Sequence, residues 1–411
     1  MTSISVVIPV YNCARYCTQC IESVLPQLAG DDEIIVVDDA SSDNTVESLQ
    51  ALSSQHHRIR LILHSDNLGT LRSRRDGVLA STGDYVMLID QDDEIAPDSL
   101  NQLRQYAAGN EFDIIHFGVH VVPENSAAQK AADGMEGFLC PIPREIHGQD
   151  ILRLQFSSEH GFDWHVHHKL FRGELLRRAY SVSADTYLVL SDDLYINFII
   201  DSFAESYLAV SHAQWYLYHL GRGDTFGQPL TRESMAKLAQ RDATALRLIR
   251  EFVSTNQHSI LRNDWIGRLA DVRDRLGEHV MNEWKDNLPS SLQSNALDDI
   301  RHALSDDVIC AELYRYVRDF AYDYLQHPQD RALQQHDRTE ALRYLGYVQQ
   351  IAREETPDSV NSHYTQLRDT ALGHLHEPGG ILAQQHNPPT GFFSRISQLF
   401  RNSRFSKLRR Q

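Results

Sequence analysis

The chain of 411 residues lacks any hydrophobic run that approaches the length of a membrane-spanning helix. It is also poor in basic residues, because 39 Lys and Arg stand against 56 Asp and Glu, for a formal net charge of −17. A surface that follows nucleic-acid phosphates needs clustered Lys and Arg, so this balance excludes general nucleic-acid binding by the body of the protein. The first ten residues have no basic start before a long apolar stretch, and we expect no secretory signal there.

Cysteine is scarce, and three of the five cysteines lie close together at Cys13, Cys17 and Cys20. An odd number in a long chain indicates free thiols in a reducing cytoplasm rather than a disulfide framework. The spacing also matches the iron–sulfur motif of radical SAM enzymes, although Gln19 stands where that motif often has an aromatic residue. The same positions fall on a predicted helix, so we favour buried thiols that act as small apolar groups.

Four apolar runs, each followed by a turn and a helical pattern, organise the first hundred residues. The runs are residues 5–10, 33–37, 59–63 and 85–89. Strands that alternate with helices predict an α/β fold, a mostly parallel sheet flanked by helices. Acids that follow different strands then meet at one edge of the sheet. The stretch 123–148, with its Ala, Gly, Pro and Asn, is expected to be a loop or flap.

Three acids, Asp90, Asp92 and Asp93, directly follow the fourth apolar run. Carboxylates this close repel one another unless a cation neutralises them, and hard oxygen ligands suit Mg²⁺ or Mn²⁺. We interpret this corner as a metal site. The alternative is a polar turn with an Asp as helix N-cap, but Asp98 can cap the next helix, which leaves the earlier acids unexplained.

Four motifs occur in order in the first hundred residues: VVIPVYN, VVDDASSDNT, NLG followed by Arg74 and Gly77, and GDYVMLIDQDD. Together they resemble the inverting family-2 glycosyltransferases of the GT-A (Rossmann-like) fold, over about the first 225 residues. The resemblance implies a metal-dependent enzyme that moves a sugar from a nucleotide-sugar, with a UDP-sugar favoured, to a hydroxyl acceptor. It suggests bacterial surface polysaccharide or glycolipid synthesis as the setting. The rival interpretation is a sugar-nucleotide-binding or membrane-scaffold protein without turnover, against which the intact acids argue.

The resemblance also assigns roles residue by residue. The residues that it assigns to the nucleotide are Pro9, Tyr11, Asn12, Asp39, Arg74 and Asp90. Those that it assigns to the Mn²⁺ or Mg²⁺ ion are Asp92, Asp90, Asp93 and His219. An ionised Asp39 accepts a hydrogen bond from a ring N–H, which uracil offers, and Arg74 lies near the diphosphate. Arg222 would contact a phosphate from a loop that Gly221 and Gly223 allow to reorder.

The pair Asp192-Asp193 stands where the family carries Glu-Asp at the start of a helix. The resemblance makes Asp193 the catalytic base, which removes the proton of the acceptor hydroxyl, and gives Asp192 a part in positioning the acceptor. The alternative is that either acid only caps a helix that starts at Leu194.

Trp164 and Lys169 match a family segment near the acceptor. Three histidines, His165, His167 and His168, lie between them. They raise a zinc hypothesis, which we disfavour because no matching Cys or Glu pattern accompanies them. Surface histidines on a turn or strand are the expectation.

The texture of the chain changes after about residue 228. We expect a glycosyltransferase domain at 1–228, an α-helical accessory domain at 229–385 that binds an acceptor or partner or forms a homo-oligomer, and a basic amphipathic tail at 386–411. The tail carries six basic residues and no acid beside an apolar stripe, a pattern that favours an anionic membrane surface and a peripheral place on the inner face of the cell membrane. A lipid-linked acceptor fits that location. A packed helix or a disordered tail is the alternative.

Overall fold

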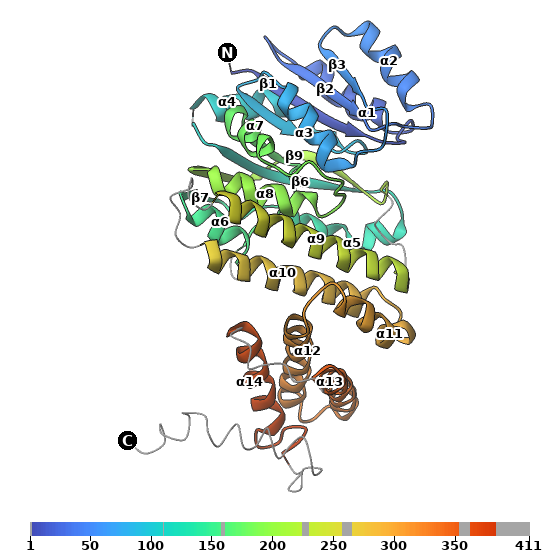
Figure 1. Ribbon diagram of the computed structural model, residues 1–411, viewed down its shortest axis with the longest axis vertical. Helices are drawn as coiled ribbons and strands as arrows, with labels where there is room; N and C mark the ends of the chain where they lie inside the picture. Colours follow the sequence, from blue (N-terminus) through green and yellow to red (C-terminus); the bar gives the residue numbers. More distant parts are fainter. Residues whose placement is uncertain are drawn as a thin grey trace. The chain divides into compact units, whose positions relative to one another are not determined.

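The computed structural model describes residues 2–109, 111–157, 161–223, 230–256, 265–352 and 362–383 (Figure 1). The chain divides into two compact units, Met1–Ala303 and Leu304–Gln411. Within the described ranges, no helix is both long and apolar enough to span a bilayer. The predicted basic tail, 386–411, lies outside the described residues.

The first unit is a mixed sheet with helices on both faces. Its strands are β1 (Ile4–Val10), β2 (Glu33–Asp38), β3 (Ile59–Leu63), β4 (Tyr85–Leu88), β5 (Glu94–Ile95), β6 (Ile114–Pro123), β7 (Arg144–His147), β8 (Lys169–Arg172) and β9 (Ser206–Leu220). Its helices are α1 (Cys17–Val24), the short 3₁₀ helix η1 (Leu25–Gln27), α2 (Thr45–Gln55), α3 (Thr70–Ala80), α4 (Ser99–Gly109), α5 (Ser126–Leu139), α6 (Asp150–Gln155), α7 (Gly173–Ser181), α8 (Asp192–Phe203), α9 (Arg232–Asn256), α10 (Trp265–Asp286) and α11 (Ser290–Arg301). The second unit contains α12 (Asp306–Gln326), α13 (Arg331–Ile351) and α14 (Ser362–His376).

The strand order is β3-β2-β1-β4-β8-β6-β9-β5, and β7 pairs with β9. The four predicted strands β1 to β4 form a parallel block, as the strand–helix alternation predicts. The rest departs from a mostly parallel sheet, because β8 runs antiparallel between β4 and β6, and β5 and β7 are antiparallel to β9. This half of the sheet brings the loop before β8 and the end of β9 to the edge that carries the acids.

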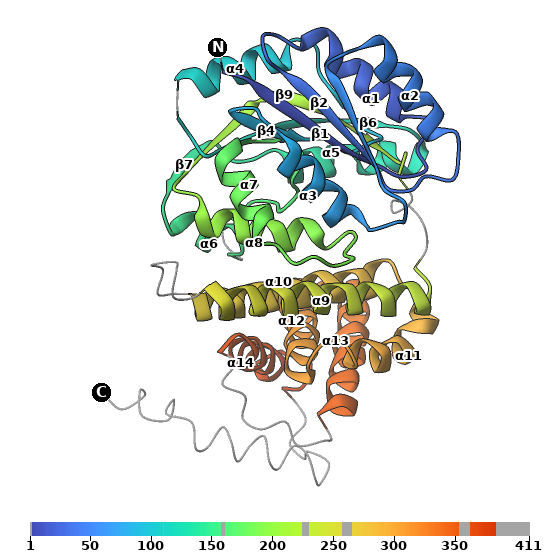
Figure 2. The same cartoon turned by 45° about the horizontal axis from the view of Figure 1, so that its top comes forward.

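Helices cover both faces of the parallel block (Figure 2). Side chains alternate along β1, so Val7 packs in the core under α3 and α7, whereas Val6 and Ile8 pack in the core under α1 and α4. Gly77 of α3 lies directly on β1, since a Cβ there would stand 2.4 Å from the Val7 Cγ1. This close approach holds α3, which carries Arg74 one turn before Gly77, against the sheet.

The first compact unit extends beyond the expected boundary at residue 228 and includes α9 to α11. Apolar packing joins these helices to the sheet unit, because Ala245, Ile249 and Phe252 of α9 are buried in the same core cluster as Phe198 of α8. These helices therefore support the sheet unit, and the second unit is the α12–α14 group alone. Its core includes Tyr316 and Tyr344, whose rings lie 5.1 Å apart, and the partly buried Phe320 ring lies 5.9 Å from that of Tyr344.

The stretch 123–148 is not a loop, which corrects the expectation from its composition. It contains α5 and the strand β7. Asn125 caps α5, with its side-chain oxygen accepting from the amides of Ala127 and Ala128. Ala128, Ala132 and Leu139 are buried on one side of this helix, so small side chains let it pack closely on the sheet.

Candidate active site

The carboxyl ends of β1, β2 and β4 open into a cleft of about 490 Å³. It is lined by most of the predicted site residues, namely Pro9, Tyr11, Asp39, Arg74, Asp90, Asp92, Asp93, Asp192, Asp193 and His219. Asn12, Arg222, Trp164 and Lys169 are not among the residues that line it. One cleft thus gathers residues that are separated by up to two hundred positions in the sequence.

The acidic corner after β4 gives each acid a different environment. Among the described residues, only the backbone amide of Asp92 itself donates to its carboxylate, and a Cβ at Gly223 would lie 3.3 Å from its Oδ2. Burial, with Asp90 adding to it, raises the pKa of Asp92 to about 6. A carboxylate that faces a cleft and to which no other described residue donates is a suitable ligand for a divalent ion.

Asp93 is buried, and protein donors occupy both of its oxygens. The Tyr216 hydroxyl and the His219 amide each donate to it at 2.8 Å. Burial and the neighbouring Asp92 raise its pKa well above the usual range. Asp93 therefore anchors the end of β9 to the corner in this conformation, and Asp92 and Asp90 remain as the accessible acids.

Buried thiols support the same corner from α1 and the turn before it. Cys13 Sγ lies 3.7 Å from the Gln91 carbonyl oxygen and Cys20 Sγ lies 3.5 Å from that of Asp90. Burial raises the pKa of Cys13 to about 12, so the thiol stays protonated and donates. The prediction of small buried thiols is confirmed, since Cys13, Cys17 and Cys20 are all buried and free.

Arg74 connects the corner to the predicted catalytic pair. Its side chain is buried, and its guanidinium lies 2.6 Å from Asp90 and 2.7 Å from Asp192 and also pairs with Asp193. Burial raises the pKa of Asp192. The positive charge of Arg74 lowers this pKa, and the negative charges of Asp193 and Asp90 raise it further. Three carboxylates can stay close together here because the guanidinium offers several donors in one plane.

The acid pair lies in the first turn of α8, but neither side chain caps the helix. Ser191 precedes them, and its hydroxyl lies 2.5 Å from Asp242 of α9, whose other oxygen is 2.7 Å from the Nδ1 of His279 on α10. Although burial opposes it, the hydrogen bond to Asp242 raises the pKa of His279. Helices from the predicted accessory domain thus hold the start of α8, which no local signal in the sequence indicated.

His219 and Arg222 share acidic partners next to the corner. His219 Nδ1 lies 2.8 Å from Glu124 and its Nε2 lies 2.7 Å from Glu94. Arg222 donates to Glu124 at 2.7 Å and to the Asp92 carbonyl oxygen at 3.2 Å. Arg222 therefore stabilises the acidic corner through the Asp92 backbone. His219 lines the cleft, whereas Arg222 does not.

The predicted nucleotide end of the cleft is shaped by Asp39. It accepts from the amides of Leu68 and Gly69 at 2.8 Å each and contacts His64 Nδ1 at 2.7 Å. Tyr11 is 44% exposed at the mouth. Asn12 accepts from the Ser42 amide at 2.8 Å, so it joins the loops after β1 and β2 rather than lining the cleft.

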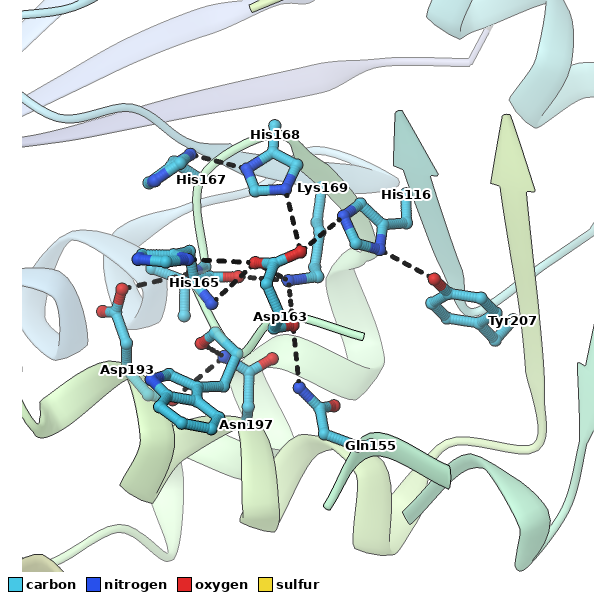
Figure 3. Close-up of polar contacts among 12 residues, drawn as sticks. His116, Gln155, Asp163, His165, His167, His168, Lys169, Asp193, Asn197 and Tyr207 are labelled. Carbon is cyan, nitrogen blue, oxygen red and sulfur yellow. Dashed lines mark hydrogen bonds and ion pairs between the residues drawn. The ribbon is translucent and has the colours of Figure 1, made fainter. Parts of the chain in front are cut away.

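The histidine-rich segment before β8 is buried rather than on the surface, which corrects the expectation (Figure 3). Only 2% of His167 and none of His168 is exposed. Lys169, expected near the acceptor, is buried too: its ammonium donates to the carbonyl oxygens of Asp163 and His165 and so positions the segment. Trp164 packs under the Arg275 guanidinium of α10. His165 and His167 line the cleft instead.

Comparison with known proteins identifies the first part of the chain. Residues 5–179 match the family model described as glycosyl transferase family 2. This domain belongs to glycosyltransferase family 2. Similar curated proteins include the uncharacterized glycosyltransferase EpsJ of Bacillus subtilis, 28% identical over 43% of this chain, and glycosyltransferase GlyG of Streptococcus pneumoniae, 34% identical over 27% of it. The matched parts amount to 49% and 37% of those relatives, so the chain spans half or less of each.

Solved structures agree on the fold of this chain. Residues 1–349 of Staphylococcus aureus TarS in complex with UDP-GlcNAc superpose with a TM-score of 0.54 at 16% identity, over 84% of this chain and 92% of that one. A second structure of TarS residues 1–349, whose description names no ligand, superposes with a TM-score of 0.53 at 17% identity. The match covers 86% of this chain and 92% of that one. At these identities the likeness shows the fold, and the predicted GT-A class is confirmed.

A second group of side chains that could bind a metal ion lies next to the cleft. His116, Asp163 and His168 offer ligand atoms that all lie within 4.8 Å of one another. The Lys169 ammonium lies 3.4 Å from the Asp163 carboxylate. Burial alone would raise the pKa of Asp163, but Lys169, His168 and His116 together hold it well below its usual range. The Lys169 ammonium thus balances the charge of the Asp163 carboxylate within this hydrogen-bond network.

Proposed function

We propose that this protein is a metal-dependent, inverting glycosyltransferase that moves a sugar from a nucleotide-sugar to a hydroxyl of a carbohydrate or lipid-linked acceptor. A UDP-sugar is the favoured donor, and bacterial surface polysaccharide or glycolipid synthesis is the setting. The observation that carries the proposal is the single cleft in which Arg74 joins Asp90 to Asp192 and Asp193. The family-2 domain and a TarS structure described as a UDP-GlcNAc complex support it.

The donor occupies the side of the cleft formed by Tyr11, Asp39 and the acidic corner. Asp92, with Asp90, would hold Mn²⁺ or Mg²⁺, which offsets negative charge on the leaving diphosphate. The Asp92 carboxylate, to which no other described residue donates, and its raised pKa fit such an ion. His219 would join these ligands through its Nε2, which lies 2.7 Å from Glu94 in this conformation.

Asp193 accepts the proton of the acceptor hydroxyl while that oxygen attacks the anomeric carbon. Its Oδ1 pairs with Arg74, and its Oδ2 has a long contact of 3.4 Å with the Val166 amide, which leaves Oδ2 to take the proton. The bond to the diphosphate oxygen breaks on the opposite face of the sugar, so the anomeric configuration inverts. Asp192 stays paired with Arg74 and fixes the guanidinium between the two halves of the cleft.

Two substitutions separate binding from chemistry. Asp193→Asn keeps Mn²⁺-supported UDP-sugar binding but loses transfer by roughly a hundredfold or more, because a general base contributes about 10²–10⁴-fold. Asp92→Asn weakens Mn²⁺-supported binding itself. Asp98→Asn is the matched control, since this acid lies near the corner but outside the cleft. Calorimetry with UDP-sugars and a transfer assay measure both effects, and wild-type transfer by Asp193→Asn would remove Asp193 as the base.

A second groove fits the acceptor. It has a volume of about 790 Å³ and is lined by the loop 187–190 together with α9 and the end of α11. Val189 and Leu190 line both this groove and the cleft, so the two lie next to each other. Tyr187 is 60% exposed there and offers an aromatic face for a sugar ring. Tyr187→Ala is expected to raise the KM for the acceptor and to leave donor hydrolysis unchanged; an unchanged acceptor KM would place the acceptor elsewhere.

The proposed membrane contact rests on residues 386–411, and the α12–α14 unit is proposed as the partner or oligomer module. Flotation of liposomes that contain anionic lipid, with the full chain and a chain truncated at Pro389, tests the first point. Equal partitioning of the two proteins would refute a membrane role for the tail.

A further inference from the structure

A chain of three hydrogen-bonded side chains leads from the buried network to the wall of the cleft (Figure 3). His168 Nε2 lies 3.3 Å from the Asp163 Oδ2, and His168 Nδ1 lies 2.6 Å from the Nδ1 of His167. His167 is a cleft-lining residue. The mechanism above makes no use of these residues.

The protons in this chain can be placed from its inner end. Asp163 is ionised, because Lys169 and two histidines hold its pKa low against the effect of burial, and an ionised carboxylate only accepts. His168 therefore carries its proton on Nε2. Burial lowers the pKa of His168 to about 4, so the ring is neutral and its Nδ1 has a lone pair. The proton in the 2.6 Å contact must then come from His167.

His167 is left with a bare Nε2. Burial, with His168 and His165 adding to it, lowers the pKa of His167 well below its usual range, so the ring is neutral with its proton on Nδ1. The ring stacks on Tyr216 at 4.8 Å and on Tyr218 at 5.8 Å, which fixes its plane. Among the described residues, none donates to its Nε2. The titratable groups around it are His165, His168, Asp163, Lys169 and these two tyrosines.

We propose that His167 is a substrate-contacting residue whose Nε2 accepts a hydrogen bond from a carbohydrate hydroxyl in the cleft, and that Asp163 and His168 are positioning residues that set its tautomer. This inference rests on the proposed glycosyltransferase function. A neutral acceptor selects against a diphosphate, whose oxygens also accept, and in favour of an O–H donor. The contact between the Val166 amide and Asp193 places the same loop beside the proposed base.

Two substitutions at one position test the two sides of the ring separately. His167→Asn places an amide near the Nδ1 position, where it donates to His168, and leaves no acceptor at the Nε2 position. His167→Gln reaches the Nε2 position with its carbonyl oxygen and restores an acceptor there. We expect His167→Asn to keep a melting temperature near that of wild type and to lose roughly ten- to hundredfold in kcat/KM for transfer, and His167→Gln to recover part of that loss.

The source of the hydroxyl follows from a second assay, donor hydrolysis without acceptor. If the hydroxyl belongs to the donor sugar, His167→Asn lowers both hydrolysis and transfer. If it belongs to the acceptor, hydrolysis is unchanged and the acceptor KM rises. His120→Asn is the control, because His120 is a surface histidine that contacts Glu136. Wild-type transfer and hydrolysis by a folded His167→Asn would overturn the proposal.

The tautomer is measured independently of turnover. In full-length protein labelled with ¹⁵N-histidine and free of ligand, two-bond ¹H–¹⁵N spectra should show a protonated Nδ1 and a bare Nε2 for His167, and the reverse for His168. The His167→Asn and His167→Gln spectra identify the His167 signals. A proton on Nε2 of His167 would refute the inference even if transfer is observed, whereas wild-type protein without transfer of any UDP-sugar refutes the proposed function.

Discussion

Replacing Arg74 with methionine removes the guanidinium that pairs with Asp90, Asp192 and Asp193 but keeps most of the buried aliphatic volume. The side chains of Arg74, Asp192 and Asp193 are 5%, 3% and 12% exposed, whereas that of Asp90 is 30% exposed and better screened. The two buried carboxylates therefore decide the cost. Removing one partner of a buried ion pair costs about 3–5 kcal/mol, and we expect a loss in that range at pH 8.

The loss of stability should depend on pH, because a carboxylate that takes up a proton loses its negative charge and no longer repels its neighbours. Without Arg74, the pKa of Asp192 in the folded state rises further above its unfolded value near 4. The folded state then binds more protons than the unfolded state across the window between these values, so stability falls as pH rises. We expect the deficit of Arg74→Met against wild type to be smaller at pH 5.5 than at pH 8.

Urea unfolding followed by tryptophan fluorescence is a suitable assay. All four tryptophans, at 164, 215, 265 and 284, lie in the first compact unit, so the signal reports that unit. Arg75→Met is the matched control, since Arg75 makes one long hydrogen bond, 3.3 Å, to the Tyr180 carbonyl oxygen. An equal deficit at both pH values, or a loss no larger than that of the control, would refute the idea that Arg74 balances the acids.

Three further predictions follow from single contacts. Burial raises the pKa of Asp92 to about 6, so the affinity for a UDP-sugar in the presence of Mn²⁺ should fall about tenfold per pH unit below 6. Calorimetric titrations measure this affinity, and an affinity that does not change from pH 7 to pH 5 would contradict the prediction. Gly77→Ala forces a methyl to within 2.4 Å of Val7 and should cost about 1–3 kcal/mol in urea unfolding, whereas Gly134→Ala, with no atom within 4 Å, should not destabilise. Because the pKa of His279 is raised in the folded state, its protonated ring stabilises the fold below about pH 6.5, and this stabilisation is lost as pH rises through the folded-state pKa. Asp242→Asn should therefore lower the free energy of unfolding more at pH 6 than at pH 8.5. A larger loss at pH 8.5 would contradict the pairing of Asp242 with His279.

Much of the site could be predicted because its residues follow regular elements. An acid directly after a buried parallel strand must emerge at the carboxyl edge of the sheet, which is why Asp39, Asp90 and Asp92 line the cleft as expected. The acid pair at the start of α8 and the strand β9 were also found from their motifs. These inferences need only local pattern and the direction of the chain.

The failures concern residues whose surroundings come from distant parts of the chain. His167 and His168 looked like surface residues, but they are buried because the Asp163 carboxylate and the Lys169 ammonium balance each other inside the fold. The composition of 123–148 suggested a loop, since small residues signal turns unless a sheet is present for the helix to pack on. The helices α9 and α10 looked separate because amphipathicity does not say which surface covers the apolar face.

The sequence by itself indicated the four strand–helix units and the edge at which the acids gather, because periodicity and chain direction are local properties. The proposed metal ligands and base came from the family resemblance of its motifs. Only the tertiary structure decided that Arg74 balances three acids at once, that α9 and α10 hold the start of α8, and that His167 lines the cleft with its Nδ1 against His168. Each of these depends on burial and on a charge supplied from another element, and neither is written in the neighbouring residues.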